Sequence, residues 1–130
     1  MILVLGGNDN MESILNSTKS FIGISEEETH FDTDIIITIN SMFARLRQMG
    51  LGPEEPFTIV DDKSVWNEFT EDDPDLSEVK TYVQIKTKLI FDPPANSNIL
   101  TALKEETKEI EWRLTVVASN KRMEGDNKNE

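Results

Sequence analysis

The side chains of this sequence with the most obvious chemical potential lie in one short acidic segment, residues 26–34. The segment reads EEETHFDTD and holds five carboxylates together with His30, the single histidine of the chain. Carboxylate oxygens are the preferred ligands of hard cations, so the segment offers in principle a metal-dependent hydrolytic site. The alternative is an acidic loop that complements the positive N-terminal end of a following helix. We favour this second interpretation.

Other kinds of catalytic or metal site find no support in the sequence. The run Asp72-Asp73-Pro74-Asp75 lacks the central glycine and terminal glutamate of a calcium loop. The absence of cysteine excludes disulfides and thiolate metal sites, and one histidine excludes an imidazole-rich site. No nucleophile–base arrangement and no glycine-rich phosphate loop is present. The sequence therefore predicts a protein that is not an enzyme and uses no metal or cofactor.

The negative charge is unevenly distributed along the chain. The formal net charge is -12, and residues 53–78 hold ten acidic residues against Lys63 alone. Such a surface repels nucleic-acid phosphates, so a protein that binds DNA by charge attraction is disfavoured. Two classes stay compatible: a protein that lets DNA pass without binding it, and an acidic mimic of DNA that inhibits a nucleic-acid enzyme.

Length and hydropathy bound the architecture. With 130 residues and 37% hydrophobic content, the chain is expected to form one small domain with a single core. No apolar run approaches the roughly twenty residues that span a bilayer. The apolar start, residues 1–5, is short and has no basic flank, so we expect no signal peptide and a cytoplasmic protein.

Residues 1–10 have two interpretations. Leu5-Gly6-Gly7 can be encoded by TTA-GGA-GGT, which contains a bacterial ribosome-binding sequence at a workable distance before Met11. In that case translation begins at Met11 and residues 1–10 are an extension that is not made natively. The alternative is a genuine short strand or arm.

The strongest structural pattern is a pair of helices joined by a proline turn. The first should begin after Asp75 or Ser77, and its broad apolar face predicts neighbours on two sides. Asp92, Pro93 and Pro94 then stop it, because proline lacks an amide hydrogen and biases the preceding residue out of the helical region. Asn96 or Ser97 can cap the second helix. Its apolar stripe, which predicts a core-facing side, is Leu100, Leu103, Thr107, Ile110, Leu114 and Val117.

Further elements are expected before this hairpin. Helices are predicted over 11–24 and 31–49, the second capped by Asp32 or Thr33 and stopped by Gly50. Residues 57–60 alternate like a short edge strand, and Asp62 is expected to cap a brief helix. The brief helix should contain Val65, Trp66 and Phe69.

The predicted fold is therefore mostly α. We expect a small bundle of four to five helices with a short extended segment near 57–60 and a flexible C-terminal tail. The helical domain spans 11–118. The apolar pattern ends after Val117, so residues 119–130 form a polar tail that is disordered unless a partner orders it.

With these elements in order, the chain resembles the head-tail connector proteins of tailed bacteriophages, also called adaptor or head-completion proteins. The resemblance covers about residues 11–118, and five motifs in one order make it more specific than any one of them. These motifs are Asp32-Thr33-Asp34-Ile35-Ile36 with Ile39-Asn40, Gln48-Met49-Gly50-Leu51-Gly52-Pro53, Val79-Lys80-Thr81-Tyr82, Phe91-Asp92-Pro93-Pro94 and Glu111-Trp112-Arg113-Leu114.

The resemblance implies a structural protein of the virion neck, assembled in the host cytoplasm. Such proteins form a ring, usually twelvefold, beneath the portal protein; the ring extends the DNA channel and docks the next neck or tail component. DNA would pass through without specific binding. The rival functions are the acidic DNA mimic and, less favoured, the metal-dependent hydrolase.

The resemblance also implies which residues contact the portal. In relatives the C-terminal segment reaches along the portal, so the polar tail would be portal-bound. Trp112 can instead be a packing anchor or a subunit contact. Arg113, Lys121 and Arg122 can instead be ordinary solvated charges. The candidate portal-binding residues are Trp112, Arg113, Ser119, Asn120, Lys121, Arg122 and Met123.

Overall fold

The structure is a computed structural model that describes residues 9–128, and this part of the chain is predominantly helical. The elements, in order, are η1 (Asp9–Met11), α1 (Ile14–Phe21), α2 (Asp32–Met49), α3 (Asn67–Thr70), η2 (Pro74–Leu76), α4 (Val79–Phe91) and α5 (Ser97–Lys128). The predicted bundle of four to five helices is confirmed. None of the described helices combines the length and apolar character needed to cross a membrane.

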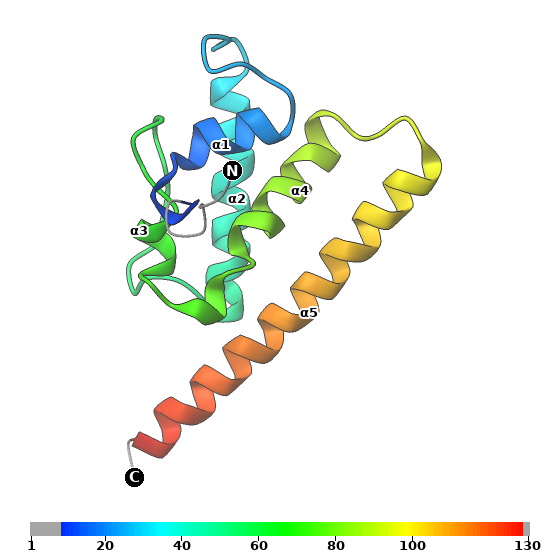
Figure 1. Cartoon of the computed structure of the whole chain (residues 1–130). Helices are drawn as coiled ribbons and strands as arrows, with labels where there is room; N and C mark the ends of the chain where they lie inside the picture. The colour runs from blue at the N-terminus through cyan, green and yellow to red at the C-terminus, as the bar shows by residue number, and fades with distance from the viewer. Residues whose placement is uncertain (1–8, 129–130) are drawn as a thin grey trace, which may run out of the picture.

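The helix α4 lies at the centre of the fold. It packs against α1 and α2 on one side and against α5 on the other, as its broad apolar face predicts (Figure 1). Trp66, Phe69 and Phe43 fill the region between α2 and α3, with the rings of Phe43 and Phe69 4.8 Å apart. The core residues of α4 and α5 include Val79, Tyr82, Val83, Ile110 and Leu114, all at most 1% exposed.

The hairpin of α4 and α5 forms as predicted. The helix α4 ends at Phe91, directly before Asp92, Pro93 and Pro94. Asn96 caps α5, because its Oδ1 accepts hydrogen bonds from the amides of Asn98 and Ile99 at 2.8 and 3.1 Å. The predicted stripe of α5 faces the bundle: Thr107, Ile110 and Leu114 are buried, and Leu100, Leu103 and Val117 are half-buried.

Some helix ends differ from the prediction. Gly50 terminates α2 in a left-handed conformation with φ of 102°, as expected. However, α2 begins at Asp32 with Phe31 in the capping position, so Asp32 and Thr33 are not caps. Asp32 instead pairs with Lys19 of α1. The helix α1 is shorter than expected and is capped by Ser13, which accepts a hydrogen bond from the Asn16 amide at 3.1 Å.

The edge strand expected at 57–60 does not form, and the described residues contain one isolated bridge, between Ser13 and Val65, but no strand. The side chain of Asn40 takes the place of a neighbouring strand. Its Oδ1 accepts from the Ile59 amide at 2.8 Å and its Nδ2 donates to the Ile59 carbonyl at 3.0 Å. A side-chain amide thus satisfies both backbone groups of the buried Ile59.

The predicted brief helix forms as α3, but Asp62 does not cap it. Trp66 occupies the N-cap position of α3 without a side-chain cap, and the Glu68 carboxylate accepts from the Val65 amide at 2.8 Å. Asp62 lies instead near the Asn16 side chain, with Nδ2 and Oδ2 3.5 Å apart. The alternation pattern and the capping pattern therefore gave the positions of residues 57–60 and of α3. They did not indicate which side chains these segments contact.

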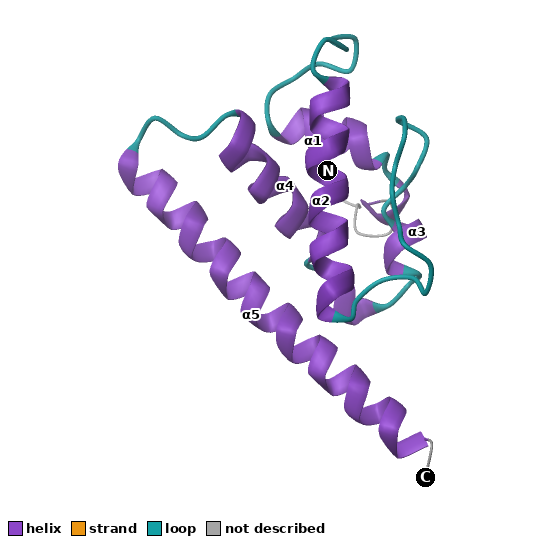
Figure 2. Cartoon of the chain, turned by 180° about the vertical axis from the view of Figure 1, so that it is seen from behind, coloured by secondary structure: helices purple, strands orange, loops and turns teal. Residues whose placement is uncertain are grey.

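The residues predicted to form a polar tail, 119–128, are helical where the structure describes them. The helix α5 continues to Lys128, and its C-terminal end projects beyond the other helices (Figures 1 and 2). The segment contains strong helix formers, no proline, and a first glycine only at Gly125. Ala118 is buried and Lys121 is ion-paired, so the body of the protein supports the helix past its apolar stripe. The two interpretations of residues 1–10 concern residues 1–8, which lie outside the described residues.

Candidate functional site

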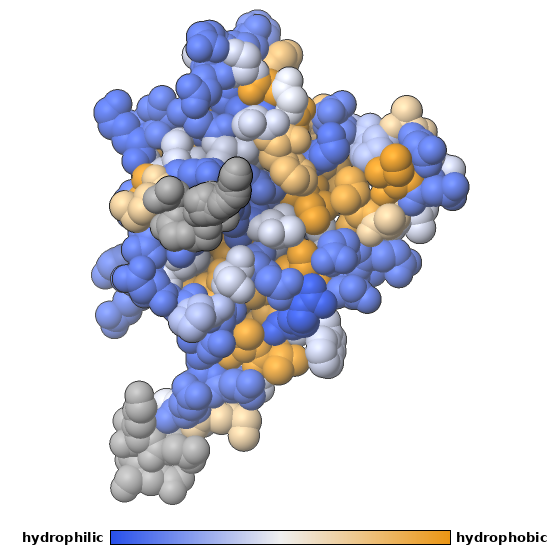
Figure 3. Space-filling view, in the orientation of Figure 1, coloured by the Kyte–Doolittle hydropathy of each residue, from blue (hydrophilic) through white to orange (hydrophobic). Residues whose placement is uncertain are grey.

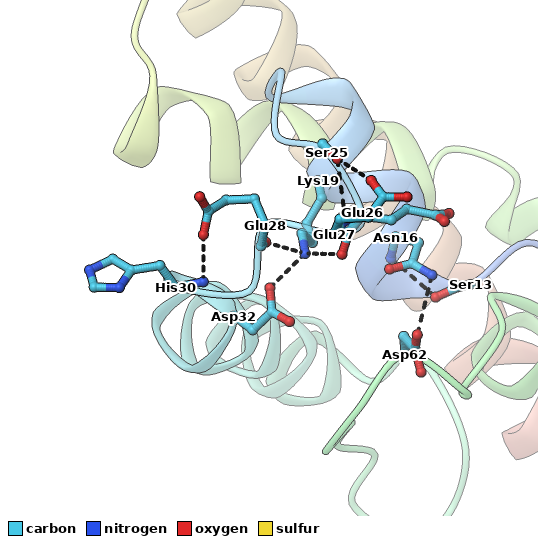
Figure 4. A network of polar contacts seen from close by, with 10 residues as sticks. All are labelled: Ser13, Asn16, Lys19, Ser25, Glu26, Glu27, Glu28, His30, Asp32 and Asp62. Carbon is cyan, nitrogen blue, oxygen red and sulfur yellow. Dashed lines mark hydrogen bonds and ion pairs between the residues drawn. The ribbon is translucent and has the colours of Figure 1, made fainter.

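The acidic segment 26–34 is organised around a buried lysine (Figure 4). Lys19 of α1 is 1% exposed, and its ammonium donates to the carbonyls of Glu26 and Glu28 at 3.2 and 2.7 Å. The same nitrogen lies 2.8 Å from Oδ1 of Asp32. Charge-assisted bonds of this kind compensate the cost of burying an ammonium group. The loop is thereby tied to both α1 and the start of α2.

The remaining acids of this segment make local contacts. The Ser25 hydroxyl donates to Glu27 and holds the pKa of that carboxyl below its usual range. The Glu28 carboxylate accepts from the His30 amide at 2.8 Å, and the His30 ring lies against Phe31. Asp32 and Asp34 occupy the first turn of α2, where negative charge is favourable. Within residues 9–128, no group of three potential metal ligands comes together.

A second feature with functional meaning is the way α5 is fixed to the body. Arg113 forms a two-point ion pair with Glu78, the residue before α4, with Nε–Oε1 and Nη2–Oε2 distances of 2.8 and 2.7 Å. Lys121 pairs with Asp73, whose other oxygen caps η2. Glu111 accepts from Arg45 and from the Tyr82 hydroxyl, both at 3.0 Å. Three ion pairs, made by Glu111, Arg113 and Lys121, thus hold α5 to the rest of the molecule.

These contacts shift the pKa values of the groups involved. The hydrogen bond from Arg113 lowers the pKa of Glu78, and that from Lys121 lowers the pKa of Asp73. Burial, followed by the hydrogen bond to Glu111, raises the pKa of Tyr82 to about 12. The carboxylates therefore stay ionised and the phenol stays neutral near neutral pH.

The seven predicted portal-binding residues lie in different environments in the structure. Arg113 and Lys121 are already engaged with Glu78 and Asp73, so they fix α5 to its own body. Asn120, Arg122 and Met123 are exposed on the last turns of α5, and Ser119 is half-buried. The interpretation of Trp112 as a packing anchor is wrong, because its side chain is 68% exposed.

Trp112 lies on the face of α5 that points away from the core. It borders a shallow hollow of about 390 Å³ lined by Glu105, Lys108, Glu109, Trp112 and Arg113. Val116, 38% exposed, follows one turn later. Lys104 and Lys108, both exposed, form no ion pair with the side chains that the structure describes. Sequence reasoning missed these lysines and Val116, although their helical spacing with Trp112 was a usable signal.

A different apolar surface lies at the tip of the hairpin. Ile90 at the end of α4 is 58% exposed and Ile99 at the start of α5 is 52% exposed. Figure 3 shows apolar side chains gathered on this side of the molecule, beside the loop that holds Asp92, Pro93 and Pro94. The helix α4 ends directly before these three residues, with Asp92 in the C-cap position.

On the other side of the molecule, the loop of residues 53–63 exposes Val60, which is 80% exposed and directly precedes Asp61 and Asp62. Sequence reasoning assigned Val60 to a strand and missed it as a surface feature. The alternation around Ile59 did indicate that Val60 points away from the core.

Charge divides the chain into two unlike parts. Residues 9–78 hold 4 of the 13 Lys and Arg residues and 17 of the 25 Asp and Glu residues. Residues 79–128, which form the hairpin, hold 9 Lys and Arg residues and 7 Asp and Glu residues. The body before the hairpin is therefore strongly acidic, whereas the hairpin is slightly basic.

Comparison with known protein families gives a match over most of the chain. The family model described as phage connector protein matches residues 14–121, which extend from α1 to the Lys121 contact on α5. No curated protein and no solved structure matches the chain.

Proposed function

Since this chain belongs to the phage connector protein family, whose members have a structural role in the phage neck, we propose that it forms a twelvefold ring beneath the portal. The ring extends the channel through which DNA leaves the filled capsid, and its lower face docks the next neck or tail component. The protein assembles in the host cytoplasm and ends in the virion neck. The observation that carries the proposal is the family match over residues 14–121, from the start of α1 to most of α5.

The charge distribution supports passage of DNA without binding. Residues 9–78 carry 17 acidic residues against 4 basic ones, so most of the surface around the body repels phosphate. Basic residues that would grip a DNA backbone are few there, and Lys19 among them is buried and paired. A channel subunit with this charge lets DNA slide past.

The proposed portal contact is the projecting end of α5. Asn120, Arg122 and Met123 are exposed there beside the half-buried Ser119. The ion pairs of Arg113 and Lys121 hold the helix in a fixed direction, which reduces the ordering cost of binding. In this proposal Arg113 and Lys121 position the helix, and the last turns bind the portal.

We further propose that the protein has no catalytic activity, in keeping with its structural family. The acidic segment 26–34 was the best candidate for hydrolytic chemistry. The Lys19 ammonium binds two of its carbonyls and faces its Asp32 carboxylate, which supports a structural role for the segment.

Assembly on portal-bearing, DNA-filled capsids tests the function. The purified chain is mixed with capsids that lack a connector, unbound chain is removed by density-gradient centrifugation, and the portal vertex is imaged by electron microscopy. We expect added ring density below the portal and retention of packaged DNA. Capsids that bind no chain, or that bind it without a ring, contradict the proposal. An acidic DNA mimic or a hydrolase would give the first outcome, because neither has a reason to bind the portal vertex.

A further inference from the structure

We propose that neighbouring copies in the ring contact each other head to tail, with the loop 53–63 of one copy seated on the outer face of α5 of the next. This inference rests on the proposed ring and goes beyond it by naming the two contacting surfaces. The occupant of each surface is a second copy of this chain.

The first surface is a defined face of α5. At 100° per residue, Lys108, Trp112 and Val116 follow one another in steps of about 40°, on the side opposite the buried Ile110 and Leu114. Trp112 and Val116 form an exposed apolar strip beside the hollow of about 390 Å³. Exposed tryptophan is rare on a solvated helix face and common at the centre of protein interfaces.

Charge borders this strip asymmetrically. Lys104 and Lys108 lie on one edge, and Glu105 and Glu109 lie on the other edge near Trp112. An acidic partner is therefore favoured on the lysine side, since the glutamates repel it on the other side, where Arg113 is already paired with Glu78. The strip thus selects both the charge of its partner and the direction of approach.

The second surface is the loop 53–63. Val60 is the most exposed of the large apolar residues in the described chain, at 80%, and Asp61 and Asp62 follow it immediately. The preceding Ile59 is 1% exposed and is held by both hydrogen bonds to Asn40. The loop consequently presents one apolar side chain and adjacent carboxylates from a fixed base, so little conformational entropy is lost on docking.

The two surfaces match in chemistry. Val60 is small enough to enter the hollow beside Trp112, while Asp61 and Asp62 would face Lys104 and Lys108. The overall charges of the two parts are also complementary. The loop belongs to the strongly acidic residues 9–78, and α5 belongs to the slightly basic hairpin, residues 79–128. Such complementarity favours association of copies over repulsion.

The placement of the two surfaces fits a ring. In both views the first half of α5 and the loop leading into α3 lie on opposite sides of the molecule, whereas the end of α5 passes below α3 (Figures 1 and 2). When two copies join through two different surfaces, the first copy keeps one surface free and the second copy keeps the other. Further copies can therefore be added at both ends. Such a head-to-tail contact closes into a ring when the rotation between copies permits.

Site-directed cross-linking tests this contact, and the natural absence of cysteine makes it clean. Asp61→Cys chains and Lys108→Cys chains are mixed, assembled on connector-free capsids, and treated with a short bifunctional maleimide. We expect a covalent dimer in the mixture and none with either variant alone. Lys86→Cys, which places the thiol on α4, replaces Lys108→Cys in the matched control and should give no dimer with Asp61→Cys.

Charge exchange provides a second measurement that does not depend on cross-linking geometry. Lys104→Glu combined with Lys108→Glu should reduce ring assembly about tenfold or more, because like charges then meet at the contact. Adding Asp61→Lys and Asp62→Lys to the same chain should restore assembly. Lys86→Glu is the control and should assemble like the wild type, and circular dichroism should show equal helix content throughout.

The outcomes separate this inference from the proposed function. Rings that form on the capsid without an Asp61→Cys to Lys108→Cys dimer, or that tolerate the Lys104→Glu and Lys108→Glu exchange, overturn the contact and leave the connector function standing. A wild-type chain that forms no ring overturns both. Dimer formation together with charge rescue supports the head-to-tail contact.

Discussion

Arg113 of α5 and Glu78, the residue before α4, are joined by two hydrogen bonds of 2.8 and 2.7 Å. Together with the Lys121–Asp73 ion pair, this contact fixes α5 to the body in one register. The helix therefore projects from the bundle in a set direction, and its last turns are presented for binding. Both pairs are partly exposed, so each contributes little to the free energy of unfolding. Their main effect is to fix the orientation of α5.

We expect the Glu78–Arg113 pair to make a pH-dependent contribution to stability. Arg113 lowers the pKa of Glu78 below its ordinary value of 4.5, so the unfolded chain binds the proton more readily than the folded one. The contribution is therefore present above pH 4.5 and is lost as the pH falls through the lowered pKa. Replacing Glu78 with Gln should lower the urea midpoint slightly at pH 7 and much less in acid.

The matched control is Glu55→Gln, an exposed acid in the loop after α2. It should leave the midpoint unchanged at both pH values. A Glu78→Gln effect of equal size at pH 7 and at acid pH would show that the pair does not act through charge.

The buried Lys19 should be among the most sensitive positions of the fold. Lys19→Met removes the donor for the Glu26 and Glu28 carbonyls and the partner of Asp32. Leaving such groups buried without a partner costs about 3 kcal/mol of unfolding free energy. Chemical denaturation measures this loss. Lys63→Met, at a site whose side chain is 84% exposed, should change the free energy by less than about 0.5 kcal/mol.

Gly52 and Gly23 provide a matched pair for the turn after α2. Both have positive φ, 100° and 86°, but a Cβ on Gly52 would lie 2.5 Å from the Phe69 ring, whereas nothing lies within 4 Å at Gly23. Gly23→Ala should cost about 1 kcal/mol for the left-handed backbone alone. Gly52→Ala should cost clearly more, because Phe69 must also move. Equal thermal midpoints for the two variants would contradict this packing.

Removing the end of α5 should separate binding from folding. A chain stopped after Arg122 keeps the Lys121–Asp73 pair, so its thermal midpoint should match that of the full chain. Its retention on portal-bearing capsids should fall, because Met123 and the following turns are missing. A chain stopped after Ser119 also loses the Lys121 pair and should be slightly less stable. Full retention of both shortened chains would show that the portal contact lies elsewhere.

The hairpin could be predicted from the sequence because its signals are local. Proline stops α4, Asn96 caps α5, and the apolar spacing of α5 identifies its buried face. Each of these depends on neighbours within a few residues. The same is true of Gly50, whose left-handed conformation ends α2.

Features that depend on distant residues were not predictable. The Asn40–Ile59 bonds join positions 19 apart, and the Lys121–Asp73 pair joins positions 48 apart. Without these partners, residues 57–60 look like a strand and residues 119–128 look like a polar tail. The prediction of Trp112 as a packing anchor failed for a different reason. Aromatic residues are usually buried, and only the position of Trp112 opposite Ile110 and Leu114 shows that it faces outward.

A cryo-electron microscopy reconstruction of the portal with this chain bound tests the central claim most directly. The account predicts a ring of copies coaxial with the portal, with the last turns of α5, including Arg122 and Met123, against the portal surface. It also predicts an open central channel wide enough for DNA. A reconstruction that shows no ring, or a ring whose α5 ends point away from the portal, would contradict the account.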